Sequence, residues 1–284
     1  MNLFYAVLLG IVQGLTEFLP ISSTAHLTVT GKLLGLINPQ QPEQWTAFIA
    51  VTQLGTMAAV LIYFFRDILG MTTSLLRDVM THGTGDGFRG YSKESRMALM
   101  IAFGTLPVVV AGLFFKDVIE GTFTKSTMVI SSSLVILAGF LWLAEKVSKR
   151  TRTIDHVTPV DALIIGCAQA LALIPGSSRS GTTITAGLFL NFTRHAAARF
   201  SFLLSIPAVL ASGIYEMMKI DPAVFDLGVA NLVIATVVAG ISGYAAIFWL
   251  LRFLVKHTTM VFVWYRIALG IALIVLVYTH LIQP

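Results

Sequence analysis

Residues 13–23 read QGLTEFLPISS, and residues 169–178 read QALALIPGSS. Each stretch interrupts an apolar region with a proline that is followed by serines. Proline removes a backbone hydrogen-bond donor and serine is a favourable N-cap, so each stretch predicts a helix, a tight turn and a new helix. The halves of each region are too short to cross a bilayer alone. We therefore expect two re-entrant helical hairpins, over residues 3–36 and 159–190, and a pair of kinked spans is the alternative.

Six other stretches are long and apolar enough to span a membrane. The 284 residues are 56% hydrophobic and only 12% charged, which is far from the composition of soluble domains. A span needs about 20 apolar residues, and each of the six stretches is bounded by charge, glycine or proline. The predicted spans are residues 45–65, 97–115, 127–144, 195–218, 226–250 and 260–281. With the hairpins, they predict an all-α polytopic membrane protein with a single membrane domain over residues 1–284.

The basic residues indicate how the spans are oriented. If residues 66–96 are cytoplasmic, the cytoplasmic side collects most of the lysines and arginines: Arg66, Arg77, Arg89, Lys93, Arg96, Lys146, Lys149, Arg150, Arg152, Arg194, Arg252 and Lys256. Only Lys32, Lys116, Lys125 and Lys219 then fall on the outer side. This bias is what the positive-inside rule predicts. It arises only if both interrupted regions return to the side from which they entered, which places the first hairpin outside and the second inside.

The two halves of the chain also resemble each other. The stretches quoted above match with one residue gapped, and each is followed by a span that is rich in phenylalanine. We therefore expect an inverted-topology repeat, with repeat 1 over residues 1–144, approximately, and repeat 2 over residues 159–284. Such repeats place a binding site near the membrane midplane, where the interrupted helices meet.

Composition excludes some classes of partner. The net charge of +5 comes from basic residues that lie between apolar segments rather than on a polar face with aromatic residues, so nucleic acid is not an expected partner. The single cysteine, Cys167, can form neither an intramolecular disulfide nor a thiolate cluster for zinc.

The first hairpin contains polar side chains at membrane depth. Gln13 and Glu17 are four residues apart and share a helix face, and an intramembrane carboxylate is costly unless it is paired or protonated. Ser22 and Ser23 precede His26 by four and three residues, so a hydroxyl can meet the imidazole and become an activated nucleophile. The alternatives are that the serines are only N-caps, that His26 bonds a carbonyl, and that Glu17 is a salt-bridge partner of Arg179.

The second hairpin predicts an anion site. Residues 175–183 read PGSSRSGTT, a cluster of hydroxyls and one guanidinium at the start of a helix. Free N–H groups, a bidentate arginine and a glycine that lets the backbone approach closely all favour phosphate. The expected ligand-binding residues are Gly176, Ser178, Arg179, Ser180 and Thr183, with Arg179 and Thr183 facing the same ligand. Small residues that pack membrane helices would explain the hydroxyls and glycines but not the arginine.

Together the two turns favour phosphoryl transfer. They offer an acid, a candidate nucleophile with a base, and donors that stabilise developing phosphoryl charge. A phosphate bounded by apolar helices implies a lipid-borne substrate. The alternative from another class is a secondary transporter or flippase of a phosphorylated lipid, because the same architecture occurs in transporters.

The motifs at residues 13–17 (QGLTE), 22–26 (SSTAH) and 175–183 (PGSSRSGTT) closely resemble the signatures of the bacitracin-resistance-type undecaprenyl-pyrophosphate phosphatases. The likeness extends over the whole chain in length, motif order and spacing. Gln13 stands where that family has Glu or Gln, and Ala25 stands where Gly is common. The resemblance implies hydrolysis of the C55 isoprenoid pyrophosphate to its monophosphate, which recycles the lipid carrier for cell-wall synthesis and gives bacitracin resistance.

The resemblance also implies roles for individual residues. Ser23 is the expected nucleophile, Glu17 and His26 are its acid–base and metal-side partners, and Arg179 clamps the pyrophosphate. It further implies a bacterial plasma-membrane location, a site that opens to the outer face, and a divalent cation, Mg²⁺ or Ca²⁺, with Glu17 as the metal ligand. Gln13, Ser22, Gly176, Ser178, Ser180 and Thr183 are the expected substrate-binding positions. Membrane lipids are expected partners, and the sequence leaves open whether the protein forms a homodimer.

Overall fold

The computed structural model describes residues 1–37, 42–83, 90–115, 126–218 and 222–279. Arg89, Lys116, Lys125 and Lys219 lie outside the described residues. Within those ranges the chain is helical, and the only β-type pairing is an isolated bridge between Arg152 and Phe192. The elements are α1 (Leu3–Phe18), α2 (Ser23–Leu33), α3 (Pro42–Tyr63), α4 (Phe65–His82), α5 (Lys93–Phe114), α7 (Thr127–Val147), η3 (Ile154–His156), α8 (Pro159–Ala170), η4 (Leu171–Leu173), α9 (Arg179–Phe189), α10 (Arg194–Met218), η5 (Pro222–Leu227), α11 (Val229–Lys256) and α12 (Met260–Tyr278).

The predicted all-α membrane fold is confirmed. Among the described residues, six helices are long and apolar enough to cross a bilayer: Gln44–Tyr63, Lys93–Phe114, Thr127–Val147, Arg194–Tyr215, Val229–Lys256 and Met260–Tyr278. They coincide with the six predicted spans to within a few residues. Large apolar side chains such as Phe103, Phe114 and Trp264 are exposed on them, as is expected of surfaces that face lipid.

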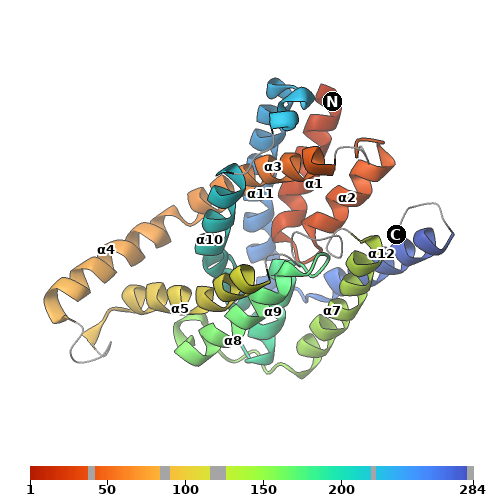
Figure 1. The fold of residues 1–284 in the computed structure, drawn as a ribbon. Coiled ribbons are helices and arrows are strands. Elements are labelled where there is room, and N and C mark those ends of the chain that lie inside the picture. Colours follow the sequence, from red (N-terminus) through yellow and green to blue (C-terminus); the bar gives the residue numbers. More distant parts are fainter. Residues whose placement is uncertain (38–41, 84–89, 116–125, 219–221, 280–284) are drawn as a thin grey trace.

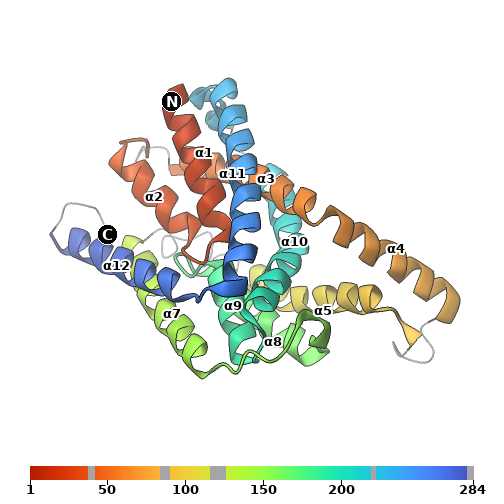
Figure 2. The same ribbon diagram turned by 180° about the vertical axis from the view of Figure 1, so that it is seen from behind.

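Helix α4 was not predicted. For residues 66–96 the sequence supported only a cytoplasmic location, whereas Phe65–His82 form a regular helix. Its charged and apolar residues alternate with the helical period, so it is amphipathic rather than uniformly apolar. Figures 1 and 2 show α4 extending away from the other helices with α5 running back beside it.

The first helix of each interrupted region packs closely on a long helix. Helix α1 lies along α11, and a Cβ atom on Gly14 would come within 2.5 Å of the Ala239 carbonyl oxygen. Helix α8 lies along α5, and a Cβ on Gly166 would come within 2.1 Å of the Gly104 carbonyl oxygen. Helices in lipid associate through such close approach of small residues. The two contacts fix both interrupted regions against spans.

The remaining helix pairs complete the arrangement. Helix α3 packs on α10 as well as on α11, and α7 packs on α12. In Figures 1 and 2, α7 and α12 lie on the opposite side of the molecule from α4 and α5. The helix pairs α1–α11 and α8–α5 are those that an inverted repeat would relate to each other. The division into two repeats itself stays a prediction.

Candidate active site

The two interruptions have the same backbone geometry. In the first, α1 ends at Phe18, and Ser22 precedes α2 with φ 74° and ψ 102°. In the second, Ser178 precedes α9 with φ 67° and ψ 110°. Each serine is the N-cap of the helix that follows: Ser22 Oγ accepts from the N–H of Ala25, and Ser178 Oγ accepts from the N–H of Gly181. Both turns thus use a serine in an uncommon left-handed conformation to aim a new helix.

This geometry corrects the alignment of the two hairpins. Ser22 follows Gln13 by nine residues, and Ser178 follows Gln169 by nine residues, so no gap is needed. The one-residue gap arises only when Pro20 is matched with Pro175. In the structural alignment, Ser23 corresponds to Arg179. One turn therefore carries a hydroxyl at the position where the other carries a guanidinium.

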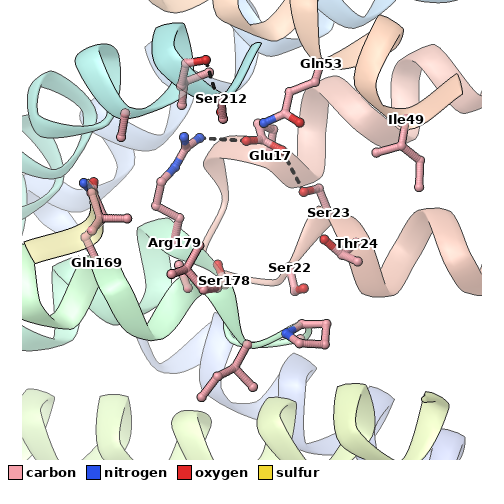
Figure 3. Close-up of a pocket in the computed structure, with 18 of the residues that line it drawn as sticks. Glu17, Ser22, Ser23, Thr24, Ile49, Gln53, Gln169, Ser178, Arg179 and Ser212 are labelled. Atoms are coloured by element: carbon pink, nitrogen blue, oxygen red, sulfur yellow. Dashed lines mark hydrogen bonds and ion pairs between the residues drawn. The ribbon is translucent and has the colours of Figure 1, made fainter. Parts of the chain in front are cut away.

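Glu17 joins the two turns (Figure 3). Arg179 Nη2 donates to Glu17 Oε1 at 2.7 Å, and Ser23 Oγ donates to Glu17 Oε2 at 2.7 Å. Gln13 Nε2 donates to the same Oε2 at 3.2 Å from one helical turn earlier. The carboxylate therefore has three donors, which compensate for its burial. The salt bridge between Glu17 and Arg179, one of the alternatives weighed from the sequence, is present.

These side chains line a cavity of about 240 Å³. Both turns contribute to its wall, and helices α3, α5 and α10 close it with mainly apolar residues. The polar residues that line it are Gln13, Glu17, Ser22, Ser23, Thr24, Gln53, Gln169, Ser178, Arg179 and Ser212, and Gly176 of the second turn lines it as well. Glu17 and Arg179 are its only charged lining residues in the part of the chain that the structure describes, so the cavity has no net charge. Thr24, Gln53, Gln169 and Ser212 were not predicted as site residues.

His26 is placed differently from the prediction. Its Nδ1 lies 2.7 Å from the Ser22 carbonyl oxygen, and because a carbonyl only accepts, Nδ1 donates. In the neutral ring, Nε2 then accepts from the Tyr265 hydroxyl at 2.6 Å. The expected hydrogen bond to a serine hydroxyl is not formed, and His26 does not line the cavity. The alternative that His26 bonds a carbonyl is correct, and the ring ties the first turn to α12.

Ser180 and Thr183 also lie outside the cavity wall. Ser180 Oγ donates to the Leu19 carbonyl at 3.1 Å and so connects the second turn to the first. Thr183 Oγ1 donates to the Arg179 carbonyl at 2.7 Å and meets Ser201 Oγ at 2.5 Å. Thr183 lies one helical turn beyond Arg179, so its hydroxyl faces the contact between α9 and α10. It does not line the cavity with Arg179, which differs from the expectation that the two residues face the same ligand.

Arg266 is a structural residue for which the sequence predicted no role. Its guanidinium is fully buried and donates to four main-chain carbonyls. The acceptors are Pro20 of the first turn, Gly176 and Ser177 of the second, and Leu134 of α7. One side chain of α12 therefore holds both turns in register. A lone arginine within the apolar span 260–281 was the available indication.

The fold and the cavity together define a class of protein. It is a polytopic membrane protein whose buried site combines a hydroxyl, a carboxylate that can accept its proton, and a guanidinium suited to phosphate.

The comparisons with known proteins agree with this class. The family model described as bacitracin resistance protein BacA matches residues 6–272. The undecaprenyl-diphosphatase of Syntrophobacter fumaroxidans is 51% identical over 280 residues, covering 99% of each chain. That of Chloroherpeton thalassium is 50% identical over 283 residues, covering 96% of each chain. The chain belongs to the BacA family.

Proposed function

We propose that this protein is an integral-membrane phosphatase that hydrolyses undecaprenyl diphosphate to undecaprenyl phosphate and inorganic phosphate. The observation that carries the proposal is the connected set Ser23–Glu17–Arg179 in the wall of one buried cavity. Relatives that carry this activity in their names align over nearly the whole chain. Hydrolysis of this lipid recycles the carrier for cell-wall synthesis and gives bacitracin resistance.

Substrate binding begins at Arg179. A diphosphate carries more negative charge than the single carboxylate of Glu17, so the guanidinium exchanges its ion pair with Glu17 for phosphate oxygens. Gly176 and Ser178 line the same wall and lie beside the start of α9, whose N-terminus favours an anion. The exchange frees Glu17 Oε1 from its ion pair, while Oε2 keeps the hydrogen bond from Ser23.

Ser23 is the nucleophile. Its hydroxyl already donates to Glu17 at 2.7 Å, so Glu17 accepts the proton as Oγ attacks the terminal phosphorus. The P–O bond to the lipid-bearing phosphate breaks, and undecaprenyl phosphate leaves with the bonding electrons. The proton on Glu17 passes to the departing undecaprenyl phosphate, which restores the carboxylate. Glu17 then accepts a proton from the water that attacks the phosphoserine, the bond between Ser23 Oγ and phosphorus breaks, Oγ regains a proton from Glu17, and inorganic phosphate is released. Direct attack by water on the substrate is the alternative, and it leaves Ser23 unlabelled by substrate phosphate.

A divalent cation, Mg²⁺ or Ca²⁺, fits the cavity only if the substrate helps to hold it. No group of three His, Cys, Asp or Glu side chains that could hold a metal is found in the described ranges, and both ring nitrogens of His26 are engaged. Glu17 would hold the cation, together with the buried Oε1 of Gln13, which lacks a hydrogen-bond partner in the structure. When bound, the cation would neutralise phosphate charge.

The apolar wall of the cavity suits the isoprenoid chain. Ile49, Val108, Ala208 and Val209 line it on helices that face lipid elsewhere. The proposal places the protein in the bacterial plasma membrane, with both interrupted regions re-entrant and the site open to the outer face. The biased distribution of basic residues and the matching helix pairs support this orientation and the inverted repeat. Homodimer formation stays a prediction.

The test is phosphate release from undecaprenyl diphosphate by purified protein in detergent. Wild type is compared with Glu17→Ala, Ser23→Ala and Arg179→Ala, with and without EDTA. Release that requires a divalent cation and is lost in the variants supports the proposal and its site. Folded wild type that releases no phosphate, but moves a phosphorylated lipid across a bilayer, would establish the transporter instead.

A further inference from the structure

Gln169 is the equivalent of Gln13 in the second hairpin, but it lacks the hydrogen bond that Gln13 makes with Glu17. In the first hairpin, Gln13 donates to Glu17, four residues later. The structural alignment of the turns makes Gln169 the equivalent of Gln13, and the residue four positions after Gln169 is Leu173. Leucine cannot accept a hydrogen bond. The second hairpin therefore carries the amide without the carboxylate.

The Gln169 amide is buried and unsatisfied. The residue is 1% exposed, and neither Nε2 nor Oε1 has a hydrogen-bond partner in the structure. It nevertheless lines the cavity. Polar groups that are removed from water without a partner destabilise the folded protein, and native proteins contain few of them. A buried amide that borders a cavity and lacks a protein partner is placed to bind a ligand in that cavity.

The position of Gln169 indicates which part of the ligand it meets. In Figure 3, Arg179 lies between Glu17 and Gln169. Ser23, which attacks the terminal phosphorus, is hydrogen-bonded to Glu17 and therefore lies on the other side of Arg179 from Gln169. A diphosphate held by Arg179 with its terminal phosphate beside Ser23 thus extends its second phosphate toward α8. That second phosphate is the one that stays on the lipid.

We propose that Gln169 is a substrate-binding residue that donates from Nε2 to the lipid-bearing phosphate of the diphosphate. The inference rests on the proposed phosphatase function and adds a binding residue to it. An amide is suited to this position because it supplies a donor without a second positive charge, so the monophosphate product can still dissociate. The same contact also stabilises the charge that develops on the leaving oxygen.

The experiment measures inhibition by the two products separately. Gln169→Leu is expected to raise the inhibition constant of undecaprenyl phosphate and the KM for the diphosphate about tenfold, the usual loss for one hydrogen bond to a charged group. Inhibition by inorganic phosphate, which occupies the Ser23 and Arg179 side, is expected to stay unchanged. The melting temperature is expected to stay level or rise, because leucine replaces an unsatisfied buried amide. A merely structural role would move both inhibition constants and lower the melting temperature.

Two further variants complete the design. Gln169→Glu keeps the shape and adds a negative charge, so it is expected to weaken inhibition by undecaprenyl phosphate more than the leucine does. Cys167→Ala changes an exposed side chain on the same helix and serves as the matched control. Unchanged inhibition by undecaprenyl phosphate in both Gln169 variants, with active wild type, overturns the proposal alone. If wild type releases no phosphate, the proposed function fails, and direct binding of undecaprenyl phosphate to wild type and variants still tests Gln169.

Discussion

Arg179 donates to Glu17 at 2.7 Å although the two residues are 162 positions apart in the chain. Their side chains are largely buried, with 19% and 9% of their surfaces exposed. The pair is a direct ionic link between the two hairpins, and it lies in the wall of the cavity that we propose as the substrate site. Changes to either residue therefore affect both stability and catalysis.

Loss of the Glu17 carboxylate is expected to abolish turnover. Glu17→Gln keeps the shape but cannot accept the Ser23 proton, so kcat is expected to fall by about 100-fold or more. Single substitutions Glu17→Gln and Arg179→Met each leave an unpaired partner and are expected to cost about 1–3 kcal/mol of stability. The double variant is expected to lose less than the sum of the two. Additive melting-temperature changes in this cycle would contradict a stabilising pair.

Substitutions of Ser23 and Ser22 are expected to have different effects, because Ser23 is the proposed nucleophile and Ser22 is the N-cap of α2. Ser23→Ala removes the nucleophile and is expected to lower kcat by at least about 100-fold with little change in melting temperature. Ser22 has φ 74°, so Ser22→Gly is tolerated by the backbone and is expected to retain most activity. Phosphate release is measured for both variants, together with transfer of ³²P from substrate to the protein. Retained activity in Ser23→Ala with loss in Ser22→Gly would reverse the assignment.

Arg266 is expected to be essential for folding. Its removal leaves carbonyls of both turns without their donor, so Arg266→Met is expected to destabilise the protein by about 3 kcal/mol or more. Arg266→Lys keeps the charge but cannot reach four acceptors and is expected to be intermediate. Thermal unfolding in detergent measures the effect. A melting temperature equal to wild type in Arg266→Met would mean that the turns are held by other contacts.

The contact between α1 and α11 at Gly14 is expected to be disrupted by any side chain at that position. A Cβ atom there would lie 2.0 Å from Ser242 Oγ and 2.5 Å from the Ala239 carbonyl oxygen, so Gly14→Ala forces α1 away from α11. The expected cost is about 1–3 kcal/mol. Gly139→Ala on α7 is the matched control, because a Cβ there meets nothing within 4 Å. It is expected to be neutral or slightly stabilising. Equal melting temperatures for the two variants would contradict the close contact.

Asp78 is expected to make stability depend on acid pH. Hydrogen bonds from the Ser95 hydroxyl, and from the backbone N–H and hydroxyl of Ser92, hold the pKa of the Asp78 carboxyl well below its usual value. The stabilisation is therefore complete above the unfolded pKa of about 4 and is lost as pH falls below it. The melting temperature of Asp78→Asn is expected to lie below that of wild type at neutral pH, with the difference shrinking below about pH 4. A difference that is constant down to pH 3 would contradict an ionised Asp78.

The features that the sequence could predict are those that depend on residues close together in the chain. The prolines before Ser22 and Ser178 interrupt apolar runs, and span length follows from bilayer thickness, so helices and turns were predictable from nearby residues. The hydrogen-bond partners of His26 and Arg266 could not be predicted in this way. Tyr265 is 239 residues from His26, and the acceptors of Arg266 are main-chain carbonyls, which every residue possesses. Helix α4 was not predicted because its charged residues interrupt the long apolar run that marks a span, although they belong to an amphipathic helix.

The Glu17–Arg179 pair also bears on which lipids can occupy the cavity. The surrounding bilayer presents a large excess of ordinary phospholipids, whose phosphodiester headgroups carry one negative charge on phosphorus. Such a headgroup offers Arg179 no more charge than Glu17 already does, so it gains little by displacing the carboxylate. A terminal diphosphate offers more charge and can displace it. If the proposed site is correct, the ion pair selects against ordinary phospholipids, because Arg179 stays bound to Glu17 until a more highly charged lipid displaces the carboxylate.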